Sequence, residues 1–185
     1  ARVGAELGQE IFLSPDLTTL LTRRRLDEPP GNGHFGEIHL ATVRRFGMPD
    51  ARHCGFDALV DFPPHGCVAA DFGRAIPGLE QGFAGRIFDY RDLARDANAR
   101  RSHDLPNFPG VVPSWDNTAR KGNRAHIFLG GTPLRYRAWL SESIRLAASD
   151  PALPEPLVFI NAWNEWAEGC HLEPDESYGK GWLEA

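Results

Sequence analysis

The stretch Pro156–Gly169 (PLVFINAWNEWAEG) decides the expected fold and also carries the candidate chemistry. Its first part, Leu157–Ala162, is an apolar run of the length that is typical of a fully buried strand. Two carboxylates follow between two tryptophans: Glu165 and Glu168, with Trp163 and Trp166. In α/β barrels the catalytic groups lie just past the carboxyl ends of the buried parallel strands. The order of residues therefore predicts an active-site segment.

Two interpretations of Glu165 and Glu168 are open from the residues alone. A carboxylate pair beside indole rings suits a carbohydrate site, because an indole offers a flat apolar face to a sugar ring and the carboxylates supply acid–base chemistry at the glycosidic bond. The alternative is a solvated helix face, where Glu–x–x–Glu is common. Two tryptophans within four positions favour the carbohydrate site, and Asn164 adds a group for a sugar hydroxyl or for orienting a carboxylate.

A second polar cluster follows another short apolar run, Val111–Pro113. One interpretation is hydroxyl recognition at the same edge of the sheet. The other is a structural turn that caps a helix, with Arg120 paired to Asp116. The cluster consists of Trp115, Asp116, Asn117 and Arg120.

Two further polar groups are expected to be structural. Asp61 and His65 flank a double proline, and a rigid proline turn explains them better than contact with substrate. Glu173 is expected to hold the active loop by accepting backbone hydrogen bonds.

Composition excludes several classes of function. The 185 residues are 42% hydrophobic and 24% charged, with a net charge of −5. No apolar run approaches the roughly 20 residues that cross a bilayer, no signal peptide is visible at the start, and scattered basic residues give no sign of a nucleic-acid partner. The three cysteines are widely spaced and predict neither disulfides nor a zinc site. We expect a cytoplasmic protein without metal or cofactor, since no glycine-rich phosphate loop is present either.

Strands alternate with helices in the predicted order of elements, which favours a parallel sheet in an α/β fold. Helices are expected over Ser14–Arg25, over Asp89–Arg101 with Leu93 and Ala97 inward, and from Thr132–Pro133 onward. The apolar face of the last helix is predicted to be Leu134, Trp139, Leu140, Ile144 and Leu146. Strands are expected over Glu37–Val43, Phe56–Phe62, Val111–Pro113, Ala125–Leu129 and Leu157–Ala162, and a loop with short elements over residues 66–88.

Three segments resemble the WbsX family of glycosyltransferases: Gly55–Pro64 (GFDALVDFPP), Val112–Arg120 (VPSWDNTAR) and Ile160–Pro174 (INAWNEWAEGCHLEP). That family is similar in turn to the family-99 glycoside hydrolases of the endo-α-mannosidase type. The resemblance implies a (β/α)8 barrel of the TIM-barrel type, with only the C-terminal half present, in strands near 37–43, 56–62, 110–114 and 157–162. Residues 1–33 match poorly, and residues 34–185 form the half-barrel domain.

The chain is short for a complete barrel, which takes about 250 residues. We therefore expect a portion of a longer protein, and exposed strand edges predict self-association of this fragment.

The resemblance also implies roles for individual residues. Glu165 corresponds to the base that deprotonates the sugar 2-hydroxyl, and Glu168 to the acid that protonates the leaving oxygen, by a route through an anhydro sugar. Residues 115–120 correspond to a sugar-contacting loop, where the hydrolases carry a Gly-Tyr-Asp-Asp type of pattern. The expected catalytic residues are thus Glu165 and Glu168, and the expected substrate-binding residues are Trp115, Asp116, Asn117, Arg120, Trp163, Asn164 and Trp166.

The function implied is a carbohydrate-active enzyme that cleaves or transfers glycosyl groups on an oligosaccharide or polysaccharide, in the metabolism of a bacterial surface polysaccharide such as lipopolysaccharide O-antigen. The alternatives are an endo-α-mannosidase-like hydrolase of other glycans and a non-catalytic carbohydrate-binding remnant.

Overall fold

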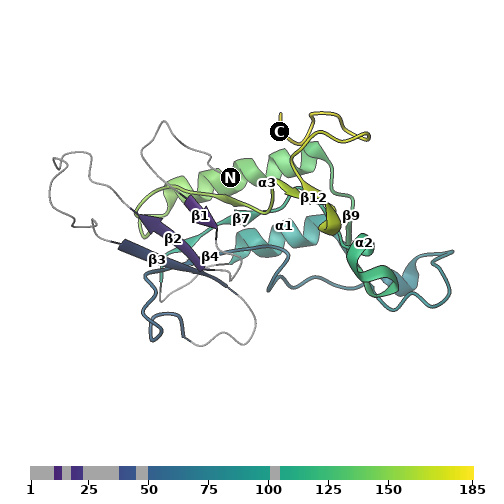
Figure 1. The fold of residues 1–185 in the computed structure, drawn as a ribbon, viewed down its shortest axis with the longest axis horizontal. Coiled ribbons are helices and arrows are strands. Elements are labelled where there is room, and N and C mark those ends of the chain that lie inside the picture. The colour runs from purple at the N-terminus through teal and green to yellow at the C-terminus, as the bar shows by residue number, and fades with distance from the viewer. Residues whose placement is uncertain (1–10, 14–17, 23–37, 45–49, 101–104) are drawn as a thin grey trace.

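A computed structural model describes residues 11–13, 18–22, 38–44, 50–100 and 105–185 of the chain (Figure 1). The strands β1 (Ile11–Leu13) and β2 (Thr18–Thr22) form an antiparallel pair, and β2 pairs antiparallel with β3 (Ile38–Val43). These strands continue into a five-stranded sheet in the order β1-β2-β3-β4-β6.

Parallel strands make up the part of the structure that positions the site. β3 pairs parallel with β4 (Ala58–Val60), and β4 pairs parallel with β6 (Asn107–Phe108). One residue further along, β7 (Gly110–Val111) pairs parallel with β10 (Phe159–Ile160). Residues 107–111 therefore lie between β4 on one side and β10 on the other, and the carboxyl ends of these strands point the same way.

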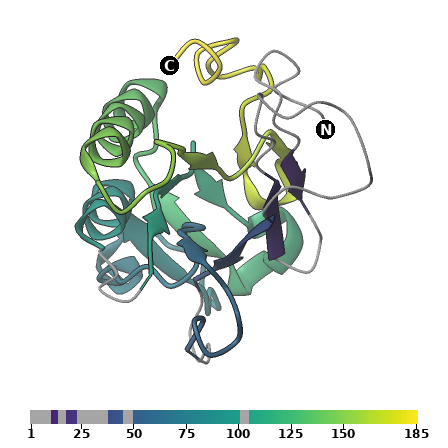
Figure 2. The ribbon, with the colours of Figure 1, turned by 90° about the vertical axis from the view of Figure 1, so that its left-hand side faces the viewer.

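Two long helices connect the parallel strands. α1 (Tyr90–Ala99) lies in the chain between β4 and β6, and α3 (Pro133–Ser149) lies between β7 and β10. Each begins at a side-chain cap, because Asp89 accepts from the Arg91 N–H and Thr132 accepts from the Arg135 N–H. Figure 2 shows the two helices side by side on one side of the strands.

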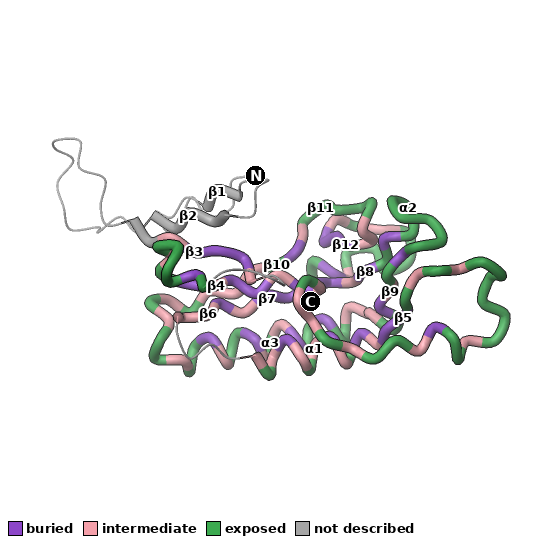
Figure 3. The backbone as a smooth tube through the Cα atoms, turned by 90° about the horizontal axis from the view of Figure 1, so that it is seen from below, coloured by how far each residue is buried: buried purple, intermediate pink, exposed green. Residues whose placement is uncertain are grey.

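The two helices pack against each other and against β7. The rings of Tyr90 and Trp139 meet edge to face, with centroids 5.5 Å apart. Tyr90 also donates its hydroxyl to the carbonyl of Val112, at 2.6 Å, just past β7. A larger buried cluster includes these side chains, and a smaller one consists of Ala41, Ala58, Val60 and Phe108. Figure 3 shows the buried stripes of both helices facing the buried strands.

A three-stranded unit adjoins this core. β5 (Arg86–Asp89) pairs parallel with β9 (His126–Leu129), which pairs antiparallel with β8 (Trp115–Asp116). Three single turns of helix lie near it: η1 (Gly73–Ala75), α2 (Thr118–Lys121) and η2 (Gly122–Arg124). The last described unit is a hairpin of β11 (Asn164–Glu165) and β12 (Cys170–His171), joined through η3 (Trp166–Glu168).

Most of the predicted elements are confirmed, with shorter bounds. The strands expected over 37–43, 56–62, 125–129 and 157–162 are β3, β4, β9 and β10, and the strand expected over 111–113 is β7, which begins one residue earlier. The helix expected over 89–101 is α1, with Leu93 and Ala97 buried as predicted. The loop expected over 66–88 contains η1 and the start of β5.

Two predictions about helices are wrong. The helix expected over Ser14–Arg25 is contradicted by β2, because Thr18–Thr22 pairs along its length with β3; threonines suit a pleated strand, and leucine spacing alone does not separate the two states. On α3 the buried side chains are Tyr136, Trp139, Ser143 and Ala147. Leu134 and Ile144, expected inside, are 75% and 51% exposed.

Consecutive parallel strands joined through helices are the unit that a (β/α)8 barrel repeats. Within the described ranges the strands form no closed barrel, so the half-barrel stays a prediction. The expected domain boundary after residue 33 lies outside the described residues.

Candidate functional site

The site lies where the loops that follow β4, β7 and β10 meet. Asn161, directly after β10, is buried and donates its side-chain amide to the carbonyl of Pro63, at 2.8 Å, in the loop after β4. Ser114, after β7, donates its hydroxyl to the carbonyl of Gly169, at 2.5 Å, in the hairpin after β10. Because each of these bonds joins segments that are far apart in the sequence, the three loops are fixed relative to one another.

The hairpin β11–η3–β12 carries both candidate catalytic glutamates. Asn164 is paired with His171 and Glu165 with Cys170, so the NEWAEG segment forms a tight reversal. Gly169 ends η3 with a φ of +57°, in the left-handed region that a glycine enters without strain. A side chain at this position would also meet Asp116, whose carbonyl oxygen lies 2.7 Å from an ideal Cβ. Glycine at 169 therefore allows the hairpin to contact the segment that follows β7.

Glu165 and Glu168 have different surroundings. Glu165 is exposed, and its carboxylate makes no hydrogen bond or ion pair with any other described residue. The side chain of Glu168 is 14% exposed and forms an ion pair with Arg120, through Oε1 and the guanidinium. The other oxygen, Oε2, is buried and has no hydrogen-bond partner among the described residues. One carboxylate thus faces solvent, and the other is held by a cation from the neighbouring loop.

The structure separates the four polar-cluster residues predicted to bind substrate. Arg120 lies against Glu168 and is not paired with Asp116, contrary to the structural alternative. Asp116 is exposed and accepts from the backbone N–H of Thr118 at 2.9 Å, which forms the local turn that the alternative proposed; the N-cap residue of α2 is Asn117, whose side chain makes no capping hydrogen bond. Asn117 is 6% exposed and accepts from the backbone N–H of His126 at 2.7 Å.

Trp115 belongs to the hydrophobic core. It is 6% exposed, and the ring of His65 meets it edge to face at 6.0 Å. With Trp115 and Asn117 both buried, Asp116 and Arg120 are the two members of the predicted cluster that are exposed.

The residues predicted in the hairpin itself are accessible. Trp163 and Trp166 are 47% and 48% exposed, and Asn164 is exposed between them. The indole of Trp166 stacks on the imidazole of His171, with ring centroids 3.7 Å apart and planes 15° apart.

Sequence reasoning missed His171 and misassigned Glu173. Glu173 accepts from the indole N–H of Trp166 at 2.7 Å, so it holds a side chain of the loop and not the loop backbone that was predicted. The Nε2 atom of His171 lies 3.1 Å from the Oδ2 atom of Asp175. His171 and Glu173 directly follow the NEWAEG motif, which indicated that they lie close to the glutamates. No spacing rule, however, predicts that His171 stacks on Trp166.

Comparison with known proteins decides the family. The sequence profile described as "Glycosyltransferase WbsX" matches residues 15–185. The chain belongs to the glycosyltransferase WbsX family. It is 44% and 43% identical over 151 residues to the uncharacterized protein WxcX of two strains of Xanthomonas campestris pv. campestris. These matches cover 82% of this chain but 22% of each relative, so the chain spans about a fifth of the length of the curated relatives it matches. No solved structure matches it.

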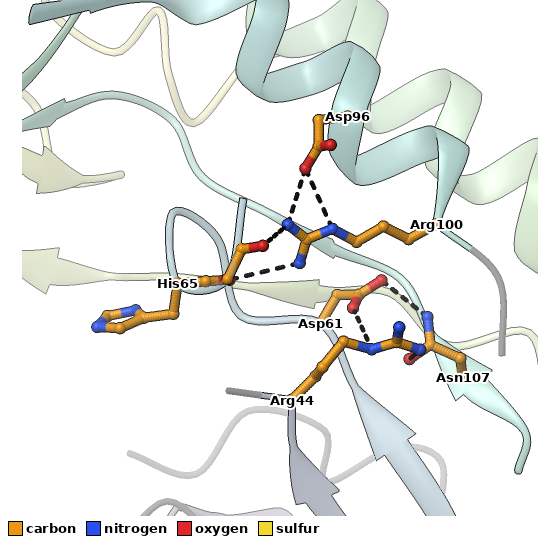
Figure 4. Close-up of polar contacts among 7 residues, drawn as sticks. Arg44, Asp61, His65, Asp96, Arg100 and Asn107 are labelled. Atoms are coloured by element: carbon orange, nitrogen blue, oxygen red, sulfur yellow. Dashed lines mark hydrogen bonds and ion pairs between the residues drawn. The ribbon is translucent and has the colours of Figure 1, made fainter. Parts of the chain in front are cut away.

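In this WbsX-family chain Asp61 has the structural role that was predicted, but it is buried, whereas a solvated neighbour of the proline turn was expected. It is 2% exposed, accepts from the side-chain amide of Asn107 at 2.7 Å, and lies 3.4 Å from the Arg44 Nε (Figure 4). These contacts join the ends of β3 and β4 to the start of β6. A second cluster in the same view holds the proline turn, because Arg100 pairs with Asp96 and donates to the carbonyl of Gly66.

The cysteines of the WbsX-family chain give no sign of a reactive centre. Cys54 is exposed, whereas burial raises the pKa of Cys67 to about 12 and also raises the pKa of Cys170. Cys170 donates its thiol to the carbonyl of Asn161 at 2.7 Å. Across the described ranges no three His, Cys, Asp or Glu side chains are grouped to hold a metal ion. The helices of the described part are all too short or too polar to cross a bilayer.

Proposed function

We propose that this segment supplies the acid–base pair of a carbohydrate-active enzyme that cleaves or transfers glycosyl groups, with Glu165 as base and Glu168 as acid. The observation that carries the proposal is the unequal placement of the two carboxylates on one hairpin, past the carboxyl end of a parallel strand. Acid–base catalysis at a glycosidic bond requires two carboxyl groups with different tasks. Membership of the glycosyltransferase WbsX family supports a saccharide substrate.

Glu165 suits the role of base. An exposed carboxylate without a described partner can approach a sugar hydroxyl without breaking an existing contact. Asn164, also exposed, precedes it and offers an amide to the same sugar. In the route that the resemblance implies, Glu165 removes the proton of the sugar 2-hydroxyl, and that oxygen then attacks the anomeric carbon.

Glu168 needs Arg120 to move before it acts as an acid. The guanidinium contacts Oε1 of Glu168, so it must be displaced before that oxygen can contact a leaving group. Arg120 is well placed for displacement because its side chain is 48% exposed. We propose that an entering sugar draws Arg120 onto a hydroxyl and leaves Glu168 to protonate the departing oxygen. The substrate would belong to a bacterial surface polysaccharide, as the resemblance implies, and the WxcX relatives come from a bacterium.

The test is to incubate the full-length protein with α-mannosides and, separately, with nucleotide sugars. New reducing ends identify a hydrolase, and release of nucleotide identifies a transferase. Glu165→Gln and Glu168→Gln should each reduce turnover at least about a hundredfold, the lower end of what acid–base groups contribute. Glu176→Gln, at an exposed carboxylate beyond the hairpin, is the matched control. Sugar binding without turnover would contradict the proposal and favour a carbohydrate-binding remnant.

A further inference from the structure

Trp166 has one ring face covered and the other face open. The imidazole of His171 lies parallel to the indole at 3.7 Å, which fills one face. Trp166 is nevertheless 48% exposed, so the opposite face is turned to solvent. An open apolar face is unfavourable in water. An indole held open next to Glu165 therefore suggests a ligand that covers it.

The edge of the same indole is also fixed. Its N–H donates to the carboxylate of Glu173 at 2.7 Å, which is a charge-assisted hydrogen bond. Rotation of the ring about its side-chain bonds would break this bond and the stack on His171 together. The contacts therefore hold the indole in one orientation before any ligand arrives.

His171 is itself anchored to the core. Its Nε2 lies 3.1 Å from Asp175, and the side chains of both residues are nearly buried, at 11% and 12% exposure. Asp175 also accepts from the indole N–H of Trp182 at 2.8 Å and from the backbone N–H of Tyr178 at 2.5 Å. Because Trp182 is 3% exposed, this chain of contacts ties the stack to the hydrophobic core.

We propose that Trp166 is a preformed stacking platform for a pyranose ring bound beside Glu165 and Glu168, and that His171 and Glu173 are positioning residues that hold it. A pyranose presents a face of C–H groups, which the negative face of an aromatic ring attracts. Donation of the indole N–H to a carboxylate increases the electron density of the ring and strengthens that attraction. A fixed ring also loses little conformational entropy on binding, so the gain appears directly in affinity.

The choice of a sugar as ligand rests on the proposed function, but the platform does not require catalysis. Trp163 provides the internal comparison. It is as exposed as Trp166, at 47%, and takes part in no ring contact within the described ranges. Two tryptophans of equal exposure thus differ in whether other side chains hold them.

The first experiment is a double-mutant cycle on the full-length protein, with the dissociation constants of α-1,2-mannobiose and cellobiose measured by calorimetry. Trp166→Ala should weaken the tighter disaccharide roughly tenfold, and His171→Ala should weaken it several-fold. The double variant should be no weaker than Trp166→Ala, because His171 acts only through the indole. Additive losses would overturn the positioning role. Glu173→Gln keeps an acceptor for the indole N–H but loses the charge, so it should lose less affinity than Glu173→Ala.

The second experiment observes the platform directly and separates it from catalysis. The protein is labelled with 5-fluorotryptophan, and the ¹⁹F resonance of Trp166 is assigned by its loss in Trp166→Phe. Either disaccharide should shift this resonance more than that of Trp163, in wild type and in Glu165→Gln alike. No shift with both sugars would overturn the platform, even if turnover depends on the glutamates. A shift without turnover would keep the platform and contradict the proposed enzyme.

Discussion

Gly169 is the point where the hairpin that holds Glu168 contacts the segment that holds Arg120. An alanine Cβ at this position would lie 2.7 Å from the carbonyl oxygen and 3.0 Å from the nitrogen of Asp116. Both are backbone atoms, so they cannot move away as a flexible side chain can. Gly179 is a matched control, because its φ of +55° is almost the same as the +57° of Gly169 and nothing lies within 4 Å of its Cβ.

The two substitutions share one cost and differ in the other. An alanine in the left-handed conformation costs about 1–2 kcal/mol at either position. Overpacking adds about 1–3 kcal/mol at Gly169 alone. Urea unfolding should therefore give a loss of about 1–2 kcal/mol for Gly179→Ala and about 2–5 kcal/mol for Gly169→Ala. Turnover should fall only in Gly169→Ala, since separating the segments moves Glu168 and Arg120 out of the positions from which both are proposed to contact the sugar. Equal losses of stability in the two variants would refute the close contact that we infer.

Three further predictions concern Arg120, Asp175 and the three cysteines. Arg120→Ala should cost only about 1 kcal/mol of stability, because the arginine is half exposed. It should nevertheless raise the KM for the sugar, because Arg120 is proposed to move onto a sugar hydroxyl, and the exposed-arginine control Arg124→Ala should leave the KM unchanged. Burial raises the pKa of Asp175, but hydrogen bonds from Tyr178 N–H, His171 and Trp182 outweigh it and lower the pKa below its ordinary 3.8. The stability that Asp175 contributes should therefore be complete above about pH 5 and be lost as the pH falls below about 4. In urea unfolding, the free energies of unfolding of Asp175→Asn and wild type should differ least in acid. A difference that does not change with pH would contradict this prediction. Iodoacetamide at about pH 8 should modify only the exposed Cys54 in the folded protein. Burial raises the pKa of Cys67 to about 12 and also raises the pKa of Cys170. A second modified thiol in the mass spectrum would contradict the burial of these two cysteines.

Local sequence signals predicted the elements whose cause is local. Thr132 followed by Pro133 predicted the start of α3, and the structure shows the Thr132 side chain accepting from the Arg135 N–H. Short apolar runs between turn residues located β3, β4 and β10. The helix predicted over residues 14–25 was wrong because Thr18–Thr22 pairs with β3, which is distant in the sequence, and this pairing outweighed the spacing of the leucines.

The candidate site also contains residues that a local motif identified and residues whose placement depends on distant contacts. Glu165, Glu168 and the two exposed tryptophans could be predicted because they lie in one short motif. The partner of Glu168 could not, since Arg120 reaches it only after two loops are folded together. The burial of Trp115 also depends on distant packing, so its residue type alone suggested a sugar contact that the structure does not offer.

The measurement that tests the central claim most directly is turnover of the two glutamate variants on substrates with different leaving groups. Glu165→Gln and Glu168→Gln should both be reduced at least about a hundredfold on an alkyl glycoside of the sugar that the wild type accepts. On the aryl glycoside, whose leaving group needs no proton, Glu168→Gln should recover turnover and Glu165→Gln should not. Equal recovery of both variants, or full activity of either on the alkyl glycoside, would contradict the assignment of Glu165 as base and Glu168 as acid.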